Sequence, residues 1–194
     1  MGKQRAVLFL MVGYPGAGKT TASQIISDLT GAVHIWADYE RKAMFGTPTY
    51  SAAESRKLYD HLNKSTELLL ADGQSVIFDT NFGKRKDRDK LREIAEAYHA
   101  ETKLAWLRVD KVVAKHRATS LAHEQSTRLL GDMPHAKFEK LTDDLEPPQK
   151  DENPILLDGT KITPEYVSAQ LTLPKARKAA GFLRFAAKKI SSKK

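Results

Sequence analysis

The chain of 194 residues contains no cysteine. This absence excludes disulfides, thiolate metal ligands and catalysis by a cysteine nucleophile. Because nothing in the composition requires an oxidising compartment, we expect a cytoplasmic protein. A chain of this length can bury one sizeable hydrophobic core without cross-links, so we expect a single domain with at most a small appendage.

Long hydrophobic runs are absent as well, and no apolar stretch approaches the roughly 18 residues that a membrane-spanning helix needs. The apolar segment 6–12 follows a basic N-terminus, as in a secretory signal peptide, but it is short and runs directly into a glycine-rich segment. We therefore interpret 6–12 as a buried strand and expect no transmembrane segment.

Acidic side chains are absent from the C-terminal segment 174–194, which carries eight basic ones. The net charge of +8 is confined to this segment, because residues 1–173 hold 24 basic and 24 acidic side chains. Apolar residues recur in it at helical spacing, namely Ala176, Ala179, Leu183, Ala187 and Ile190. We expect a basic amphipathic helix that either packs on the domain or binds nucleic acid or an anionic membrane surface.

Residues 1–173 alternate between short apolar runs and longer stretches of helical period. The strand candidates are 6–12, 33–37, 75–78, 103–109 and 154–157, and the helix candidates are 18–29, 51–71, 85–98, 111–127, 135–145 and a short helix after Pro164. This alternation predicts an α/β three-layer sandwich with a parallel sheet of about five strands. We expect a domain over 1–173 with a helical lid at about 111–135, followed by the basic segment 174–194.

A phosphate-binding loop lies between the first predicted strand and the first predicted helix. Residues 13–20 fit the pattern G-x-x-x-x-G-K-[ST]. Glycines let consecutive backbone N–H groups curl around phosphates, while Lys19 reaches the β and γ phosphates and the Thr20 hydroxyl ligates Mg²⁺. The predicted nucleotide-binding residues are Gly13, Tyr14, Pro15, Gly16, Ala17, Gly18, Lys19, Thr20 and Thr21.

Polar residues follow the second and third strands, where the ligand crevice of a parallel sheet lies. Asp38 could accept the proton of an acceptor hydroxyl, and Arg41 could bind a phosphate or carboxylate of that acceptor. Asp79 could hold Mg²⁺ or orient Arg41, with Asn81 beside it on the substrate side. The alternatives are that these acidic residues merely cap the following helices and that Arg41 is a surface residue.

The lid carries two arginines that could clamp the transferring phosphate. Arg117 and Arg128 are eleven residues apart, which is close to three helical turns, so an unbroken helix would show both on one face. Such a clamp would exclude water and protect ATP from hydrolysis. We therefore predict Lys19, Asp38, Arg117 and Arg128 as the catalytic residues, with ordinary surface positions as the alternative for either arginine.

Three segments together resemble the polynucleotide 5′-hydroxyl kinase branch of the P-loop kinases, with zeta-toxin-like small-molecule kinases as near relatives. They are the loop 13–20, Asp38-Tyr39-Glu40-Arg41 and Asp79-Thr80-Asn81, and the resemblance spans about residues 6–160. It implies ATP and Mg²⁺ as cofactors, Asp38 as general base, Arg41 as acceptor ligand and a γ-phosphate contact by a lid arginine, best matched by Arg117.

The sequence therefore predicts an ATP-dependent kinase for a hydroxyl acceptor, slightly favouring the 5′ end of a nucleic acid. A kinase for a small molecule, such as a metabolite, a sugar nucleotide or an antibiotic, shares nearly every one of these residues. A regulatory module that binds ATP, hydrolyses it slowly and contacts a partner through 174–194 is a second alternative. The pair Asp38 and Arg41 favours the kinase.

Overall fold

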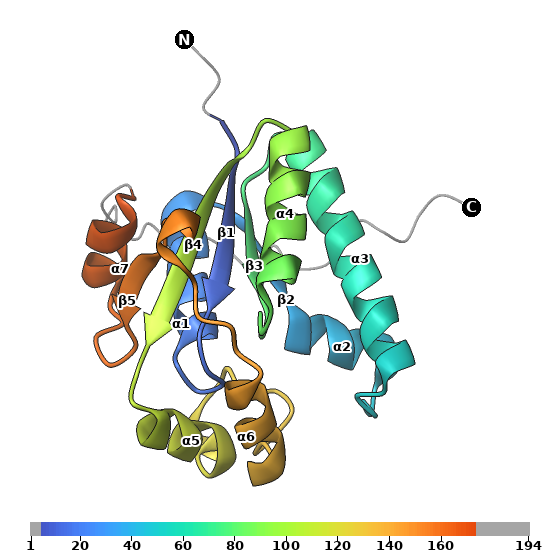
Figure 1. The fold of residues 1–194 in the computed structure, drawn as a ribbon, viewed down its shortest axis with the longest axis vertical. Coiled ribbons are helices and arrows are strands. Elements are labelled where there is room, and N and C mark those ends of the chain that lie inside the picture. Colours follow the sequence, from blue (N-terminus) through green and yellow to red (C-terminus); the bar gives the residue numbers. More distant parts are fainter. Residues whose placement is uncertain (1–4, 174–194) are drawn as a thin grey trace.

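The computed structural model describes residues 5–173, which form a five-stranded parallel sheet with helices on both faces (Figure 1). The strands are β1 (Val7–Val12), β2 (Val33–Trp36), β3 (Val76–Asp79), β4 (Glu101–Arg108) and β5 (Ile155–Asp158), in the order β2-β3-β1-β4-β5. The predicted α/β P-loop NTPase fold with five parallel strands is confirmed. The basic segment 174–194, with the amphipathic helix predicted over 174–190, lies outside the described residues.

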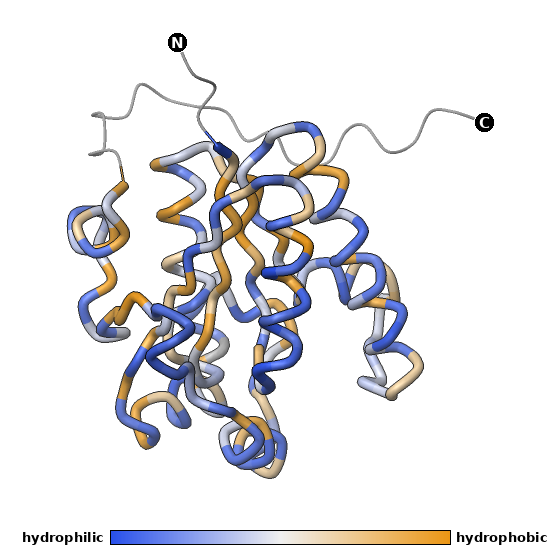
Figure 2. Tube along the Cα trace, turned by 45° about the horizontal axis from the view of Figure 1, so that its top comes forward, coloured by the Kyte–Doolittle hydropathy of each residue, from blue (hydrophilic) through white to orange (hydrophobic). Residues whose placement is uncertain are grey.

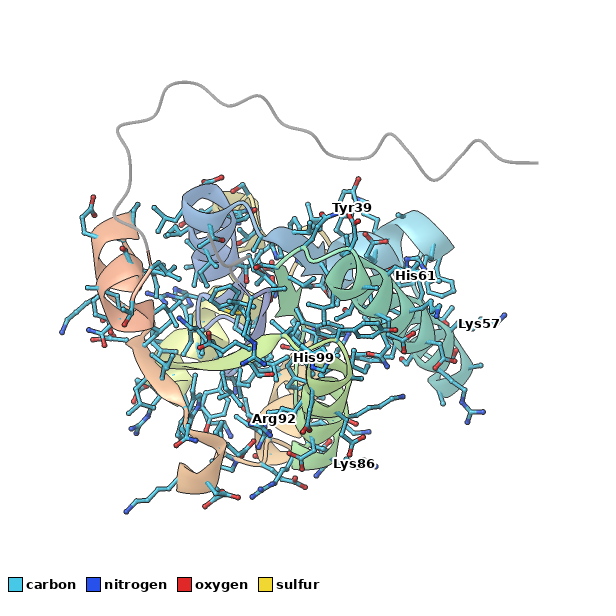
Figure 3. All side chains as sticks on the ribbon, turned by 90° about the horizontal axis from the view of Figure 1, so that it is seen from above. Tyr39, Lys57, His61, Lys86, Arg92 and His99 are labelled. Carbon is cyan, nitrogen blue, oxygen red and sulfur yellow. The ribbon has the colours of Figure 1, made fainter. Side chains whose placement is uncertain are left out.

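Two pairs of helices cover the sheet and give it three layers (Figure 1). One face carries α1 (Lys19–Thr30) and α7 (Pro164–Leu171), and the other carries α3 (Ala52–Ala71) and α4 (Arg85–Ala97). Lys57 of α3 and Lys86 of α4 point outward, away from the sheet (Figure 3). None of the helices within 5–173 is long and apolar enough to cross a membrane.

The central strand β1 is buried on both sides because its side chains alternate between two hydrophobic clusters. Leu8 and Leu10 pack with residues of α3 and α4. Phe9 and Met11 pack with residues of α1 and α7. Figure 2 shows this hydrophobic colouring along the strands in the middle of the molecule. The double burial anchors the segment 13–18, which follows β1 directly.

The segment 111–143, which includes the predicted lid at about 111–135 and is called the lid below, lies beyond the carboxyl ends of the strands (Figure 1). It contains α5 (Lys111–Thr119), the 3₁₀ helix η1 (Ala122–Glu124) and α6 (His135–Asp143). The expected single helix over 111–127 is wrong, since α5 ends at Thr119. The Ala118 carbonyl instead accepts hydrogen bonds from the Met133 amide at 2.9 Å and from the Arg128 side chain at 2.8 Å. The returning lid segment thus takes the place of a further helical turn.

Two shorter elements also position the site. Helix α2 (Ala37–Phe45) follows β2 without a loop, and the 3₁₀ helix η2 (Lys150–Glu152) precedes β5. The fully buried Arg88 of α4 donates two hydrogen bonds to Glu152, at 2.7 and 2.8 Å. This buried ion pair ties the segment before β5 to α4.

Candidate active site

A cavity of about 450 Å³ opens at the carboxyl ends of the strands. The loop after β1 and the start of α1 contribute Pro15, Gly16, Gly18, Lys19, Thr20 and Thr21 to its lining. The ends of β2 and β3 contribute Trp36, Ala37, Asp38, Asp79, Thr80 and Asn81. The predicted phosphate loop and the predicted acidic residues therefore share one cavity.

The loop 13–18 needs glycine at specific places. Gly16 has a φ of 81°, and a Cβ there would lie 2.3 Å from the Ala114 carbonyl oxygen. Gly18 has a φ of 97° and is the N-cap of α1, where no side chain accepts a hydrogen bond. The N-terminal amides of α1 thus keep their capacity to bind an anion.

Lys19 folds back onto its own loop. Its Nζ donates hydrogen bonds to the carbonyl oxygens of Gly13 at 2.8 Å and Tyr14 at 2.9 Å. Burial lowers the pKa of Lys19 to about 8, against the opposing charges of Asp79 and Asp38. Of the other predicted loop residues, Gly13, Tyr14 and Ala17 do not line the cavity, and Ala17 is fully buried.

Asp38 lies in the first turn of α2 and lines the cavity. Burial and the charge of Asp79 raise its pKa, while the positive charges of Arg128 and Lys19 oppose the rise. The N-cap of α2 is Trp36, and the helix has no side-chain cap. Asp38 is therefore not the cap of this helix, and its carboxylate is available to interact with a ligand in the cavity.

Asp79 is the last residue of β3 and is only 3% exposed. Its Oδ2 lies 3.1 Å from His34 Nε2 on the neighbouring strand β2. Helix α4 begins at Arg85 after Lys84, so neither Asp79 nor Asn81 caps it. The contact between His34 and Asp79 was not predicted from the sequence. The alternation of side chains along a strand could have indicated it, because His34 lies two residues before Trp36 and therefore on the same face of β2.

Arg41 does not line the cavity. It is 7% exposed and donates a hydrogen bond to Glu54 of α3. Although burial opposes ionisation, hydrogen bonds from Arg41 and Thr49 lower the pKa of Glu54 to about 2. The structure thus places Arg41 in a buried ion pair behind Asp38, neither at the surface nor in the crevice.

Both lid arginines reach the cavity, although no single helix carries them. Arg117 Nη1 donates to the Gly159 carbonyl at 3.0 Å. Arg128 Nη2 donates to the carbonyls of Ala118 at 2.8 Å and Gly131 at 3.2 Å. Its buried Nε has no hydrogen-bond partner within the described part of the chain.

Two groups of lining residues were not predicted. The loop after β5 contributes Gly159, Thr160 and Ile162, and the lid contributes Leu121, Glu124, Gln125 and Thr127. The first group could have been found, because it follows the carboxyl end of the fifth predicted strand. The lid residues carry no such signal, because they follow the end of α5, where the sequence predicts a continuous helix.

Thr20 and Asp79 present oxygen atoms to the same cavity, as a Mg²⁺ site requires. Among the described residues, no group of three acidic or histidine side chains lies close enough together to hold a metal ion. Mg²⁺ in phosphoryl-transfer sites binds one or two protein oxygens together with nucleotide phosphates. The residues present therefore fit this ion.

The parallel sheet, the glycine loop and the cavity together define an α/β P-loop NTPase fold. A family model described as an AAA domain, AAA_33, matches residues 8–148, and the chain belongs to this family. Uncharacterized proteins of Mycobacterium tuberculosis and Mycobacterium bovis are 31% identical over 105 residues, 48% of this chain. The chain spans about a fifth of the length of these relatives, 21% in each case.

Solved structures share the fold. A protein of Chloroflexus aurantiacus proposed to be a kinase has a TM-score of 0.70 at 17% identity, covering 87% of this chain and 98% of that one. A gluconokinase of Sinorhizobium meliloti has a TM-score of 0.60 at 22% identity, covering 88% and 91%. The Pnkp1/Rnl/Hen1 RNA repair complex gives 0.61 at 22% identity, covering 77% and 46%. These likenesses show a shared P-loop fold and leave both the activity and the acceptor undetermined.

Proposed function

We propose that the protein is a Mg²⁺- and ATP-dependent kinase that transfers the γ-phosphoryl group to a hydroxyl acceptor. The observation that carries this proposal is the position of Asp38, which shares the cavity with Lys19 and the phosphate loop. Burial and Asp79 raise the pKa of Asp38, which makes its carboxylate a stronger base. A base beside a phosphate loop suits the activation of a hydroxyl.

The cations Lys19, Arg117 and Arg128 supply the charge for the nucleotide. Each donates to neutral main-chain carbonyls in this structure. Phosphate oxygens are stronger acceptors for such donors than carbonyls are, so ATP can replace those bonds. Positive charge held at the γ-phosphate stabilises the transition state of phosphoryl transfer.

In the proposed reaction the acceptor oxygen bonds to the γ-phosphorus while the bond from that phosphorus to the β–γ bridging oxygen breaks. ADP leaves, and the acceptor proton passes to the Asp38 carboxylate. Thr20 and Asp79 would hold Mg²⁺, whose chemistry is to neutralise charge on the β and γ phosphates. Lid residues on α5 and η1 would exclude water from the cavity.

The acceptor is the finer part of the proposal. The segments 38–41 and 79–81, and the fold shared with an RNA repair complex, favour a polynucleotide 5′-hydroxyl. The equal numbers of basic and acidic side chains in 1–173 favour a small molecule instead, because a groove that tracks nucleic acid is normally basic. The basic segment 174–194 could supply affinity for nucleic acid or an anionic membrane surface in a cytoplasmic protein.

The experiment is transfer from γ-labelled ATP with Mg²⁺ to 5′-hydroxyl DNA and RNA oligonucleotides, beside nucleosides, sugars and sugar nucleotides. Label on an oligonucleotide supports the polynucleotide kinase, and its loss in a chain ending at residue 173 assigns the basic segment to substrate capture. Label only on a small molecule supports the metabolite kinase. Release of free phosphate that no acceptor changes would replace the kinase with a slow regulatory ATPase.

A further inference from the structure

The acceptor hydroxyl has to lie at the ends of β2 and β3, because the proposed base Asp38 is there. The segments 36–38 and 79–81 line this part of the cavity, which is called the acceptor end below. The sheet register pairs Trp36 with Asp79, so the two segments lie side by side. The side chains of the acceptor end therefore decide which acceptors fit.

Among residues 5–173, the acceptor end has no cation of its own. The cations that line the cavity are Lys19 at the start of α1 and Arg117 and Arg128 of the lid. In the proposed reaction the triphosphate of ATP takes up all three. The ionisable side chains of the acceptor end itself are the two carboxylates Asp38 and Asp79.

Two nearby cations are held outside the cavity. Arg41 pairs with the buried carboxylate of Glu54, which also accepts hydrogen bonds from the amide and hydroxyl of Thr49 at 2.7 and 2.8 Å. Lys137 of the lid places its Nζ 3.0 Å from the centre of the Tyr50 ring, and neither cation lines the cavity. Moving Arg41 to a phosphate on the acceptor would leave Glu54 buried without its cation.

Neutral groups complete the acceptor end. Trp36 is the only aromatic side chain among the described residues that line the cavity. Its ring stacks with those of His34 and Tyr39, at centroid distances of 5.9 and 6.2 Å, and these neighbours fix its position. The Asn81 side chain makes no hydrogen bond within the described part of the chain, so its amide can both donate to and accept from a ligand. An apolar wall with a few neutral polar groups suits a carbon ring that carries hydroxyls.

We propose that the acceptor is an uncharged polyhydroxyl compound, either a sugar or a nucleoside without a phosphate. Trp36 packs against its ring, and the Asn81 amide binds hydroxyls next to the one that faces Asp38. This inference rests on the proposed kinase function and narrows its acceptor. A phosphorylated acceptor, including a nucleic acid 5′ end, brings negative charge beside the two carboxylates without a balancing cation and is disfavoured.

The test measures transfer from γ-labelled ATP by the full chain to acceptors that differ only in a phosphate. The pairs are a sugar against its monophosphate and a nucleoside against its 3′-monophosphate. The uncharged member of each pair should have the higher kcat/KM by about tenfold or more, because like charges repel at the acceptor end. Asn81→Ala should raise KM for the uncharged member about 3- to 10-fold through the loss of a hydrogen bond. Preference between the sugar and the nucleoside identifies the source of the hydroxyls.

Asn81→Lys supplies the missing cation and should shift the preference about tenfold toward the phosphorylated member of each pair. Gln74→Lys is the matched control, because it adds the same charge at an exposed position before the amino end of β3. It should leave the preference unchanged. A native chain that prefers the phosphorylated members would overturn the inference, and so would equal preferences in the two lysine variants.

If no acceptor receives label, the kinase proposal fails, and binding then decides the inference separately. The chain has two tryptophans, so in a Trp106→Phe variant the fluorescence comes from Trp36 at the acceptor end. This variant is titrated with the same four compounds in the presence of Mg²⁺ and a non-hydrolysable ATP analogue. A saturable change with an uncharged compound, at least ten times weaker with its phosphorylated partner, keeps the site. Equal or tighter binding of the phosphorylated compounds, or no saturable change, removes it.

Discussion

Asp38 of α2 and Asp79 of β3 face one cavity, and burial together with the charge of Asp79 raises the pKa of Asp38. The sheet register explains their proximity, because Asp79 of β3 pairs with Trp36 of β2, two residues before Asp38. The Asp79 carboxylate also contacts His34, whereas the Asp38 side chain does not cap helix α2. The two carboxylates therefore suit different tasks, with Asp79 as the proposed metal ligand and Asp38 as the proposed base.

Asp38→Asn should spare ATP binding and lower kcat about 10²- to 10⁴-fold, the usual contribution of a general base. In the native protein, the rate should fall on the acid side as Asp38 becomes protonated, at a pH above the ordinary carboxyl pKa of 3.8. That acid limb should be missing from the residual activity of the variant. Rates across pH, with ATP binding measured separately, check both points, and transfer retained at the native rate would remove Asp38 from the mechanism.

Lys19→Met should abolish transfer and yet stabilise the nucleotide-free protein. The folded pKa of Lys19 is about 8, below its ordinary 10.5, so the unfolded chain binds the proton more tightly. Native stability should therefore rise between pH 8 and 10.5, and the variant should lack this rise. Thermal unfolding with and without ATP measures both effects. A variant that ATP still stabilises as strongly as the native protein would contradict the assigned role.

Arg41→Ala should lower the melting temperature by several degrees, because Glu54 would stay buried without its cation. The folded pKa of Glu54 is about 2 and its ordinary value 4.5, so its contribution is complete above pH 4.5 and is lost as the pH falls toward 2. Glu54→Gln should remove that acid dependence. Unfolding across this pH range tests the pair, with the exposed Arg56→Ala of α3 as control. An unchanged melting temperature would show that Arg41 is not structural.

Gly159→Ala should weaken ATP binding although no side chain is lost. A Cβ at this position would lie 2.3 Å from the Ala17 carbonyl oxygen, so the phosphate loop must shift. Overpacking of this kind predicts about a tenfold loss of affinity or more. Gly83→Ala is the control, because its Cβ would meet its nearest atom at 3.5 Å. Equal affinities for the two variants would mean that the loop adapts freely.

Arg117→Ala should lower kcat about 10²- to 10³-fold with little change in melting temperature, since a charge at the γ-phosphate acts on the transition state. Among the described residues, the Arg117 side chain donates one hydrogen bond, to the Gly159 carbonyl. Arg128→Ala should also lower the melting temperature, because Arg128 bonds two lid carbonyls. Kinetics and thermal unfolding of both variants separate the two roles. A stable Arg128 variant with the larger loss of kcat would reverse them.

The sheet and the strand ends could be predicted from the sequence because their signals are local. Apolar runs of strand length alternate with helical periods, and the ends of β1, β2 and β3 lie within one residue of the predicted positions. The glycine pattern then places Lys19 next to the cavity. The rule that ligands bind at strand ends adds Asp38 and Asp79.

The rest depends on contacts between residues far apart in the chain. The sequence shows the charge of Arg41 but not that Glu54, on another helix, neutralises it. The end of α5 at Thr119 depends on Met133 and Arg128 returning to Ala118. Tertiary hydrogen bonds set the partner of Arg41 and the end of α5, and neither pattern nor propensity contains these bonds.

Lys19, Arg117 and Arg128 each donate hydrogen bonds to main-chain carbonyls. An anion that binds in the cavity has to replace these bonds, so its affinity depends on how many of the three cations it reaches. A single inorganic phosphate reaches fewer of these cations than a triphosphate does, so it replaces fewer carbonyl bonds with the stronger bonds to phosphate oxygens. A triphosphate chain reaches several cations at once, and every contact after the first forms at a high effective concentration. Under the proposed function, the cavity should therefore bind ATP far more tightly than a single phosphate, and inorganic phosphate should compete with ATP poorly even in large excess.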